Sequence, residues 1–253
     1  MNENRLFELR DVTVPYRRDP DRATLEEVNW TVHENDLWVV GGLQGTGKSD
    51  LIFMLAGLTK PIRGSYTLFG QDMGSRFGDE FLPSRLRMGV VFDDSRLLNH
   101  LTFAENIALP ARYHENLHAG EADGWVEALL KAANIHNFAH NTPSMVAWHW
   151  RRRAALVRAL ALRPELLFLE NPLRGLDWRH TAWWIDFIQR LWRGHDLMRG
   201  RPLTIVASTD EFRPWRDVGA KFAVLREQRF EIAHENMPAD DAPTMTGMAT
   251  GEY

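Results

Sequence analysis

The amino-acid sequence predicts an α/β fold in which a helical lobe is inserted into a core of strands and helices. Three observations lead to this prediction: an apolar run, a glycine-rich loop and a helical run succeed one another at residues 37–55, a helical pattern extends from 102 to about 162, and apolar runs of strand length lie on both sides of it. At 253 residues with 44% apolar content, the chain is long enough to bury the core of one large domain of this kind.

Composition excludes several kinds of site and partner. The chain has no cysteine, which excludes disulfides, thiolate metal sites and cysteine nucleophiles. Residues 1–5 lead into no apolar stretch of signal-peptide length, and no apolar run approaches a membrane span, so we expect a soluble, cytoplasmic protein. The net charge of −4 argues against a nucleic-acid partner, and we interpret Arg151, Arg152 and Arg153 as a solvated helix face.

Two strands are predicted before the glycine-rich loop. Residues 6–16 and 28–32 mix β-branched, apolar and polar residues at short period, which is typical of strands. The charged segment 17–22 between them is predicted to be a loop. Both strands are therefore expected to lie close to the loop that follows them.

The glycine-rich loop extends from Gly42 to Ser49 and reads GLQGTGKS. It matches the pattern G-x-x-x-x-G-K-[ST], in which backbone N–H groups at a helix N-terminus bind phosphates. The motif places Lys48 on the β- and γ-phosphates of a nucleotide and the Ser49 hydroxyl on Mg²⁺. Upstream, Tyr16 could stack on adenine, or it could be an ordinary strand tyrosine. The expected nucleotide-binding residues are Tyr16, Gly42, Gln44, Gly45, Thr46, Gly47, Lys48, Ser49 and Asp50.

The remaining elements follow from their apolar patterns. Strands are predicted at 65–70 and 87–92, and the clearest helices of the inserted lobe at 121–134 and 152–162. A buried strand at 165–169 ends at Glu170, where a carboxylate could hold Mg²⁺ through water. The last expected elements are a core-facing helix at 181–192, a buried strand at 203–207 and a disordered tail at 233–253.

Several motifs, in this order and spacing, resemble those of the ATP-binding subunits of ABC transporters over roughly residues 5–230. The loop Gly42–Ser49 corresponds to the Walker A motif, and Tyr16 falls at the position of the family's adenine-stacking aromatic residue. The other matching segments are 99–106 after the Q-loop, 153–164 of the signature helix and 172–177 after Walker B. Within the family, residues 105–110 and 164–169 look most like the ATPases of MCE-type (Mla-like) lipid transporters.

The resemblance implies a P-loop NTPase core with an antiparallel β subdomain and an inserted α-helical subdomain. The ATP-binding domain would comprise residues 1–232, with the helical subdomain at about 93–162. The implied cofactors are ATP and Mg²⁺, bound at a dimer interface between the Walker motifs of one subunit and the signature of the other. The implied partners are a second ATPase subunit, identical or different, and separate transmembrane permease subunits that hold the protein at the inner face of the membrane.

The sequence departs from the family where the family's chemistry takes place. Asp93 replaces the Q-loop glutamine, and residues 146–150, Val-Ala-Trp-His-Trp, replace the signature Leu-Ser-Gly-Gly-Gln. Walker B ends in Glu170-Asn171 instead of Asp-Glu, so an amide stands where a general base should be. Thr209 stands at the position of the switch histidine. No confident catalytic residue emerges from this set.

Three hypotheses follow from these departures. In the first, the chain is an ATP-binding subunit of an ABC transporter that hydrolyses ATP weakly or not at all. In the second, it is an active transport ATPase, involved in lipid export or import, in which Glu170, Asp210, Glu211 or His149 compensates for the missing base. In the third, it is a soluble P-loop regulator that works without a permease.

Overall fold

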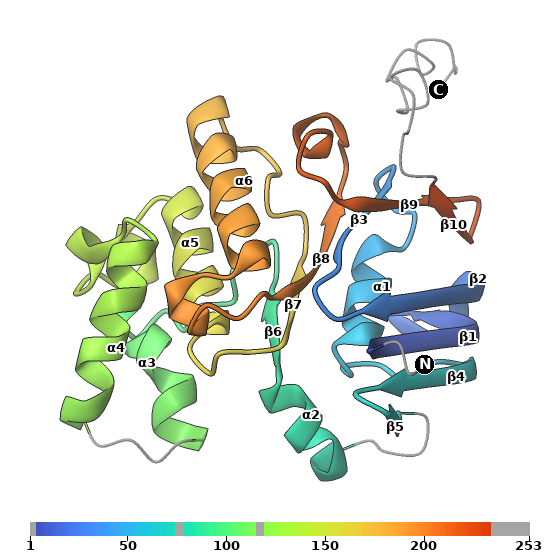
Figure 1. Cartoon of the computed structure of the whole chain (residues 1–253), viewed down its shortest axis with the longest axis horizontal. Helices are drawn as coiled ribbons and strands as arrows, with labels where there is room; N and C mark the ends of the chain where they lie inside the picture. Colours follow the sequence, from blue (N-terminus) through green and yellow to red (C-terminus); the bar gives the residue numbers. More distant parts are fainter. Residues whose placement is uncertain (1–3, 74–77, 115–118, 234–253) are drawn as a thin grey trace.

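A computed structural model of the chain describes residues 4–73, 78–114 and 119–233 (Figure 1). Its strands are β1 (Arg5–Tyr16), β2 (Asp19–His33), β3 (Leu37–Gly42), β4 (Arg63–Leu68), β5 (Gln71–Asp72), β6 (Met88–Val91), β7 (Leu166–Leu169), β8 (Thr204–Thr209), β9 (Lys221–Arg226) and β10 (Arg229–Ala233). Its α-helices are α1 (Lys48–Leu55), α2 (Leu82–Leu86), α3 (Phe103–His114), α4 (Ala119–Ala132), α5 (Trp148–Ala159) and α6 (Trp178–Arg193). Among the described residues, no helix has the length and apolar character needed to cross a lipid bilayer.

The strands form two sheets. A six-stranded sheet has the order β10-β9-β3-β8-β7-β6, in which β10 is antiparallel to β9 and the other neighbours are parallel. A four-stranded antiparallel sheet has the order β2-β1-β4-β5. Because β3, β6, β7 and β8 run in the same direction, the loops that follow their carboxyl ends meet at one edge of the larger sheet. That edge collects most of the residues singled out in the sequence.

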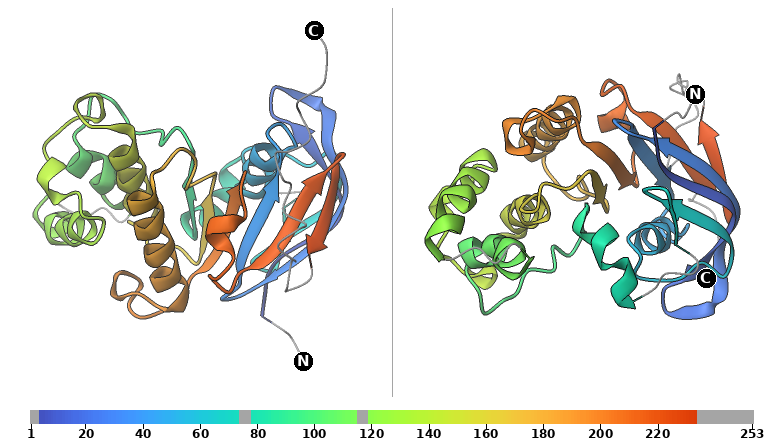
Figure 2. Two further views of the ribbon diagram at one scale, coloured as in Figure 1. Left: turned by 90° about the horizontal axis from the view of Figure 1, so that it is seen from above. Right: turned by 60° about the horizontal axis from the view of Figure 1, so that its bottom comes forward.

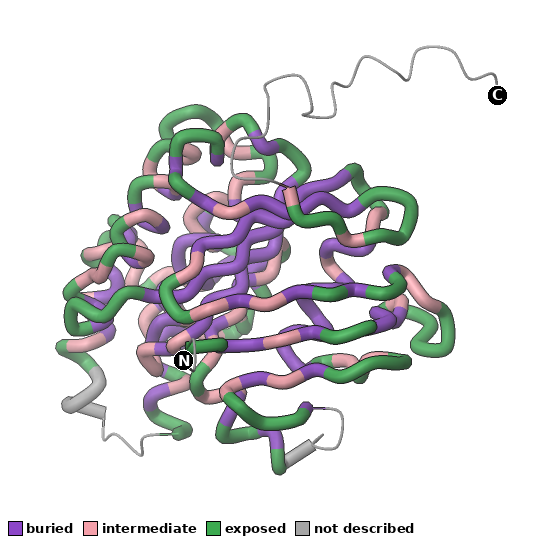
Figure 3. The backbone as a smooth tube through the Cα atoms, turned by 45° about the vertical axis from the view of Figure 1, so that its right-hand side comes forward, coloured by how far each residue is buried: buried purple, intermediate pink, exposed green. Residues whose placement is uncertain are grey.

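The six-stranded sheet is buried on both faces, as expected for a parallel sheet. On β7, Leu167 and Leu169 point into one apolar core, whereas Leu166 and Phe168 point into the other, and all four side chains are fully buried. The first core also contains residues of α3, α4, α5 and α6, and the second contains residues of α1 and the antiparallel sheet. In Figure 3 the central strands accordingly form a continuous buried layer.

Helix α1 lies between the two sheets, in contact with β1 on one side and with β3 and β8 on the other. Figure 2 shows the helical lobe of α3, α4 and α5 beside these sheets, with α6 covering the adjoining face. In the chain, the lobe lies between β6 and β7, in the segment where the sequence predicts helices. The P-loop therefore lies at the junction of both sheets with the first helix.

Two of the three arginines at the start of α5 are not solvated, which corrects the interpretation from sequence. Arg152 and Arg153 are buried, and each donates hydrogen bonds to backbone carbonyl groups. The Arg153 guanidinium also lies 3.7 Å from the centre of the Trp183 ring. A buried guanidinium needs such partners because its charge loses water on burial, and three adjacent arginines in a sequence carry no sign of which carbonyls will be near.

Other differences from the sequence prediction concern strands. Strand β2 begins at Asp19, so most of the segment predicted as a charged loop is the start of a hairpin strand. Strands β9 and β10 were not predicted. β9 is a short apolar run that lies between β3 and β10, and β10 is the edge strand, which pairs with β9 alone in this sheet. Of the tail predicted to be disordered, Ala233 is the last residue of β10, and the rest lies outside the described residues.

Phe168→Ala tests whether β7 depends on burial on both faces. The Phe168 ring is fully buried, so its removal is expected to lower the free energy of unfolding by about 3–5 kcal/mol. Urea unfolding followed by circular dichroism measures this difference. The exposed Ile62, changed to alanine, is the control and is expected to alter stability by no more than about 0.5 kcal/mol. Equal effects of the two substitutions would contradict the assignment.

Candidate functional site

The glycine loop has the backbone shape of an anion site. Gly45 and Gly47 adopt the left-handed conformation, with φ of 86° and 97°. A Cβ added at Gly47 would lie 2.4 Å from the Thr24 side chain, so only glycine fits there. Helix α1 begins directly after this residue, which directs its first N–H groups toward the loop. The loop can therefore surround a phosphate with N–H donors.

The Lys48 ammonium lies folded against the loop, with a side chain that is only 4% exposed. It donates hydrogen bonds to the carbonyl oxygens of Gly42 at 2.6 Å and Leu43 at 2.8 Å. Its third partner is the Asp210 carboxylate, at 3.0 Å from Nζ. An ammonium has three N–H donors, so all of them are engaged.

Asp50 connects the P-loop helix to the β1–β2 hairpin. Its carboxylate accepts hydrogen bonds from the Arg17 backbone N–H and from the Thr24 hydroxyl, both at 3.1 Å. These bonds hold the end of β1 and the start of β2 beside the loop, and with them the Tyr16 ring. Asp50 was expected among the nucleotide-binding residues, and its carboxylate already has these two partners.

Two cavities adjoin the loop. A cavity of about 200 Å³ follows the P-loop and holds most of the residues expected from sequence. Its lining consists of Tyr16, Arg17, Gln44, Gly45, Gly47, Lys48, Ser49, Asp50, Asp93, Asn171, Arg174 and Asp210. A second cavity, of about 440 Å³, is also lined by Tyr16, together with Arg22, Thr24, Thr46 and Gln228 among others. Tyr16 thus borders both spaces, as an aromatic residue that stacks on a base would.

Glu170 and Ser49 are neighbours, as a shared Mg²⁺ requires. The Ser49 hydroxyl hydrogen-bonds to the Glu170 carboxyl, which is buried at the carboxyl end of β7. Burial raises the pKa of Glu170, and the Ser49 hydrogen bond opposes this shift. Among the described residues there is no group of three or more histidine or acidic side chains placed to hold a metal by themselves. Mg²⁺ bound here would therefore draw its other ligands from phosphate and water.

Asn171 follows Glu170 in a strained backbone conformation. Its φ is 41°, and its N–H donates to the Ser208 hydroxyl at 3.0 Å. The side chain is buried, and within the described part of the chain its Oδ1 has no hydrogen-bond donor. The amide borders both the P-loop cavity and a third cavity of about 240 Å³. An amide at this place has no basic group that can accept a proton.

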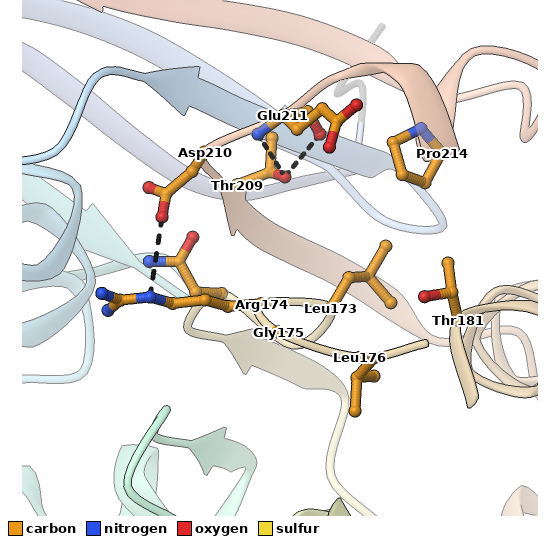
Figure 4. Close-up of a pocket in the computed structure, with 10 residues that line it drawn as sticks. Leu173, Arg174, Gly175, Leu176, Thr181, Thr209, Asp210, Glu211 and Pro214 are labelled. Atoms are coloured by element: carbon orange, nitrogen blue, oxygen red, sulfur yellow. Dashed lines mark hydrogen bonds and ion pairs between the residues drawn. The ribbon is translucent and has the colours of Figure 1, made fainter. Parts of the chain in front are cut away.

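The Thr209 hydroxyl is engaged in a local turn. It donates to the carbonyl oxygen of Glu211 at 2.7 Å, and it accepts hydrogen bonds from the Glu211 N–H and the Trp215 indole, both at 3.2 Å. Figure 4 shows this turn at the wall of the third cavity. With these partners, the hydroxyl is directed to its own segment and away from the P-loop. Thr209 does not line the P-loop cavity.

Arg152 connects the loops that follow β6 and β7. Its guanidinium donates to the backbone carbonyls of Asp93 at 3.1 Å and Arg174 at 2.7 Å, with longer contacts at 3.4 Å to those of Asn171 and Pro172. Burial lowers the pKa of Arg152, and the neighbouring Asp93 carboxylate opposes that shift. Helix α5 thereby contacts both loops through the Arg152 side chain.

Arg174 was missed by the sequence analysis. Its guanidinium lies 3.9 Å from the Asp210 carboxylate (Figure 4) and 3.5 Å from that of Asp93. Arg174 also borders the P-loop cavity. Arg17 was also missed, although it lines the same cavity. The only signal for Arg174 was its place in the segment after Walker B, beside Pro172 and Gly175, and charge alone does not reveal which way such a side chain turns.

The segment at the signature position is aromatic and partly exposed. Trp148 is 43% exposed, and its ring contacts the Arg152 guanidinium and lies close to Gly175. His149 and His180 are neighbours, with ring centres 4.3 Å apart. Burial lowers the pKa of His149, and the charge of His180 acts in the same direction, so the imidazole is neutral near neutral pH. This surface therefore presents an indole and two neighbouring imidazoles.

Comparison with known proteins identifies the family. The model of the ABC transporter family matches residues 25–174, more than half of the chain, and the chain belongs to this family. A sulfate/thiosulfate import ATP-binding protein of Mycolicibacterium paratuberculosis is 31% identical over 90% of this chain and 60% of its own length. A spermidine/putrescine import ATP-binding protein of Pseudomonas aeruginosa is 34% identical over 68% of this chain and 45% of its own length. The chain thus spans about half to three fifths of the length of these relatives.

Solved structures show the same fold. A dimeric ATP-binding cassette in a post-hydrolysis state, bound to ADP and Pi, superposes with a TM-score of 0.79 at 24% identity, over 89% of this chain and 98% of that one. A cassette of a Clostridium perfringens ABC transporter complex superposes with a TM-score of 0.73 at 20% identity, over 91% of this chain and 88% of that one. The predicted P-loop ABC ATPase fold is thereby confirmed. The resemblance to MCE-type lipid transporter ATPases stays a prediction.

The residues at the P-loop fit a magnesium nucleotide. The left-handed glycines leave room for phosphate, Lys48 supplies a cation, and the Ser49–Glu170 pair supplies oxygen ligands for the metal. Mg²⁺ bound to the phosphates would neutralise part of their charge. These contacts suit the binding of a magnesium nucleotide.

Lys48→Ala is expected to reduce ATP affinity by roughly 100-fold, because it removes the cation that the loop holds for phosphate. Isothermal titration calorimetry with Mg–ATP measures the change. The matched control is Lys131→Ala, which removes an exposed cation on α4 and should leave affinity unchanged. An affinity of the Lys48 variant equal to that of the wild type would refute the assignment of the phosphate site.

Glu170→Gln is expected to stabilise the metal-free chain at neutral pH. Because burial raises the pKa of Glu170, the folded state holds its proton more tightly than the unfolded chain. The Glu170 carboxyl therefore contributes its full stabilisation to the folded state at pH values below the ordinary glutamate pKa of 4.5. This stabilisation is lost as the pH rises through the raised pKa of Glu170. Glutamine imitates the protonated form, so its stability advantage should grow as pH rises from 4.5 toward neutrality.

Urea unfolding at several pH values, with EDTA present, measures this dependence. Glu231→Gln on the exposed strand β10 is the control and should keep the pH profile of the wild type. An advantage of Glu170→Gln that stays constant with pH would show that the carboxyl does not titrate differently in the folded state.

Proposed function

We propose that the chain is the ATP-binding subunit of an ABC transporter, and that it binds Mg–ATP but hydrolyses it slowly or not at all. In this proposal, ATP closes or stabilises an assembly of two ATPase subunits and the transporter's membrane-spanning subunits. The P-loop, with Lys48, Ser49 and Glu170, supports the binding half of the proposal. The retained P-loop predicts that ATP binds, whereas the altered catalytic positions predict that bound ATP is hydrolysed slowly or not at all.

The observation that carries the proposal is the side chain of Asn171. It directly follows Glu170 at the carboxyl end of β7 and borders the P-loop cavity. A general base must accept a proton from the attacking water, and an amide has no basic group that does so. Thr209 stands at the switch position in this proposal, and its hydroxyl is hydrogen-bonded to Glu211 and Trp215. Both side chains argue against rapid hydrolysis at this site.

The signature segment supports the same conclusion for the partner's nucleotide. In the family, small residues of the signature let the backbone approach the γ-phosphate that the other subunit holds. Here Ala147 occupies the position of the signature serine and Trp148 that of the first signature glycine, and the Trp148 indole is partly exposed on the surface. In a homodimer, both nucleotide sites would lack the general base, the switch histidine and the signature sequence. A dimer with an intact partner subunit would restore only part of each site. Neither arrangement provides a complete hydrolytic centre.

The names of the relatives support an importer. The two proteins compared above are named as import ATP-binding proteins, for sulfate/thiosulfate and for spermidine/putrescine, and a methionine import ATP-binding protein of Lactobacillus delbrueckii is 28% identical over 88% of this chain. We therefore propose an import system with separate permease subunits. The substrate would be determined by subunits other than this chain.

The alternative, an active ATPase, is favoured by one observation. Asp210 and Glu211 line the third cavity together with Asn171, so a carboxylate is available close to the position of the missing base. The other two candidates for a substitute base have neighbours of their own. Glu170 is hydrogen-bonded to Ser49, and His149 lies next to His180. If the chain turns over ATP, Asp210 and Glu211 are the first residues to substitute.

Single-turnover hydrolysis, measured beside equilibrium binding of ATP on the same sample, separates the two functions. The proposal expects binding that depends on Lys48, with no phosphate released on the time scale of active transport ATPases. Release of phosphate that is lost in Lys48→Ala would support the active ATPase instead. Absence of ATP binding altogether would overturn both.

Asn171→Glu alone is expected to leave hydrolysis weak. The substitution introduces a carboxylate, but the Thr209 hydroxyl remains tied into its turn and Trp148 remains at the signature position. Steady-state phosphate release measures the outcome, with Asn171→Gln as a control of similar size without a basic group. Robust turnover in the glutamate variant alone would show that the signature and switch positions are no obstacle.

A further inference from the structure

Four charged side chains of alternating sign form a line across the P-loop cavity. Lys48 contacts Asp210 at 3.0 Å, Asp210 faces Arg174 at 3.9 Å, and Arg174 faces Asp93 at 3.5 Å. All four line the same cavity, and they come from the loops after β3, β8, β7 and β6. Lys48 and Arg174 would both attract phosphate, yet each already has a carboxylate partner.

Asp210 is the partner of Lys48 that a phosphate can replace. The other two partners, the carbonyl oxygens of Gly42 and Leu43, belong to the loop itself and stay beside the ammonium. The Asp210 side chain is 36% exposed and lies on the segment after β8, so it can turn away into solvent. Its two oxygens face Lys48 and Arg174 separately, as the oxygens of a bound phosphate would.

Resting on the proposed function, we propose that Asp210 acts as an internal anion in the terminal-phosphate position, and that ATP displaces it and takes over Lys48 and Arg174 together. The Asp210 carboxylate therefore competes with nucleotide. Arg174 becomes a specificity residue that recognises the terminal phosphate, because a guanidinium can form paired hydrogen bonds with two phosphate oxygens.

The loose geometry of Arg174 supports this role. Its contacts with Asp93 and Asp210, at 3.5 and 3.9 Å, are longer than the charge-assisted hydrogen bonds of about 2.7–2.9 Å that a committed ion pair makes. The side chain is 47% exposed, so water screens these attractions. The Arg174 backbone, by contrast, is held firmly, since its carbonyl accepts a 2.7 Å hydrogen bond from Arg152. The residue is thus anchored at its main chain and free to exchange partners at its guanidinium.

Asp210→Asn tests the competition. The amide keeps an oxygen that can accept from Lys48 but loses the negative charge, so affinity for Mg–ATP and for ADP is expected to rise, by roughly fivefold for ATP. Asp186→Asn is the matched control, because it removes the same charge from an exposed ion pair with Arg190 on α6. Binding is measured by calorimetry with ATP, ADP and a non-hydrolysable ATP analogue.

Arg174→Gln tests recognition of the terminal phosphate. It is expected to weaken binding of the ATP analogue by roughly fivefold while changing ADP affinity much less, which a role confined to folding would not do. In the double variant with Asp210→Asn, the two effects should not add, since both side chains serve the same position. Thermal unfolding without nucleotide shows whether each variant is folded before its affinity is compared.

The outcomes are distinct. Tighter nucleotide binding in Asp210→Asn, with Asp186→Asn like the wild type, supports the inference, and so does binding that appears only in Asp210→Asn. Unchanged or weaker binding in a folded Asp210→Asn overturns it, as does an equal loss of ATP and ADP affinity in Arg174→Gln. If ATP binds through Lys48 but Asp210→Asn has no effect, the proposed function survives and only this inference fails. If no variant binds ATP, both fail.

Discussion

The site depends on one constraint, the burial of the six-stranded sheet on both faces. Strands whose side chains alternate between two apolar cores cannot shift by a residue without turning apolar groups toward the wrong core. This fixes the carboxyl ends of β3, β7 and β8 relative to one another, and with them Lys48, Glu170 and Asp210. Polar groups at that edge therefore meet in a defined geometry even though each belongs to a loop.

Buried arginines of α5 hold the loops that follow the strands of the sheet. Arg152 of α5 donates to backbone carbonyls on both sides of the cavity, and Arg153 packs among Trp150, Trp183 and His180. Hydrogen bonds from a buried charge to carbonyl oxygens are costly to leave unmade, so the loops cannot move independently of α5. Residues 148–150, which begin α5, are thereby connected through this helix to the loops that border the P-loop cavity.

The departures from the family are related to one another in space. Asp93 and Arg174 carry opposite charges and face each other across the cavity, and Trp148 lies against the chain at Gly175, next to Arg174. Thr209, smaller than a histidine, closes its own turn instead of reaching toward the P-loop. The altered residues thus form ion-pair, packing and hydrogen-bond contacts of their own.

From the sequence alone, the fold class, the P-loop and the position of most strands could be predicted. These features depend on local patterns: a spacing of glycines before Lys48, alternation in β1 and the apolar run of β7. The resemblance to the family led to the prediction that Asn171 and Thr209 stand at catalytic positions without the expected chemistry. Such statements need only the identity of a residue and its distance along the chain from a motif.

Only the tertiary structure decided what the charged side chains do. The sequence analysis interpreted Arg152 as solvated, passed over Arg174 and considered Asp210 as a substitute base. The fold instead buries Arg152 and places the Asp210 carboxylate between Lys48 and Arg174. The physical reason is that a charge interacts with whatever lies within a few ångströms, and these partners are separated by up to 162 residues along the chain. Proximity of this kind is created by the packing of the sheet and is absent from any local pattern.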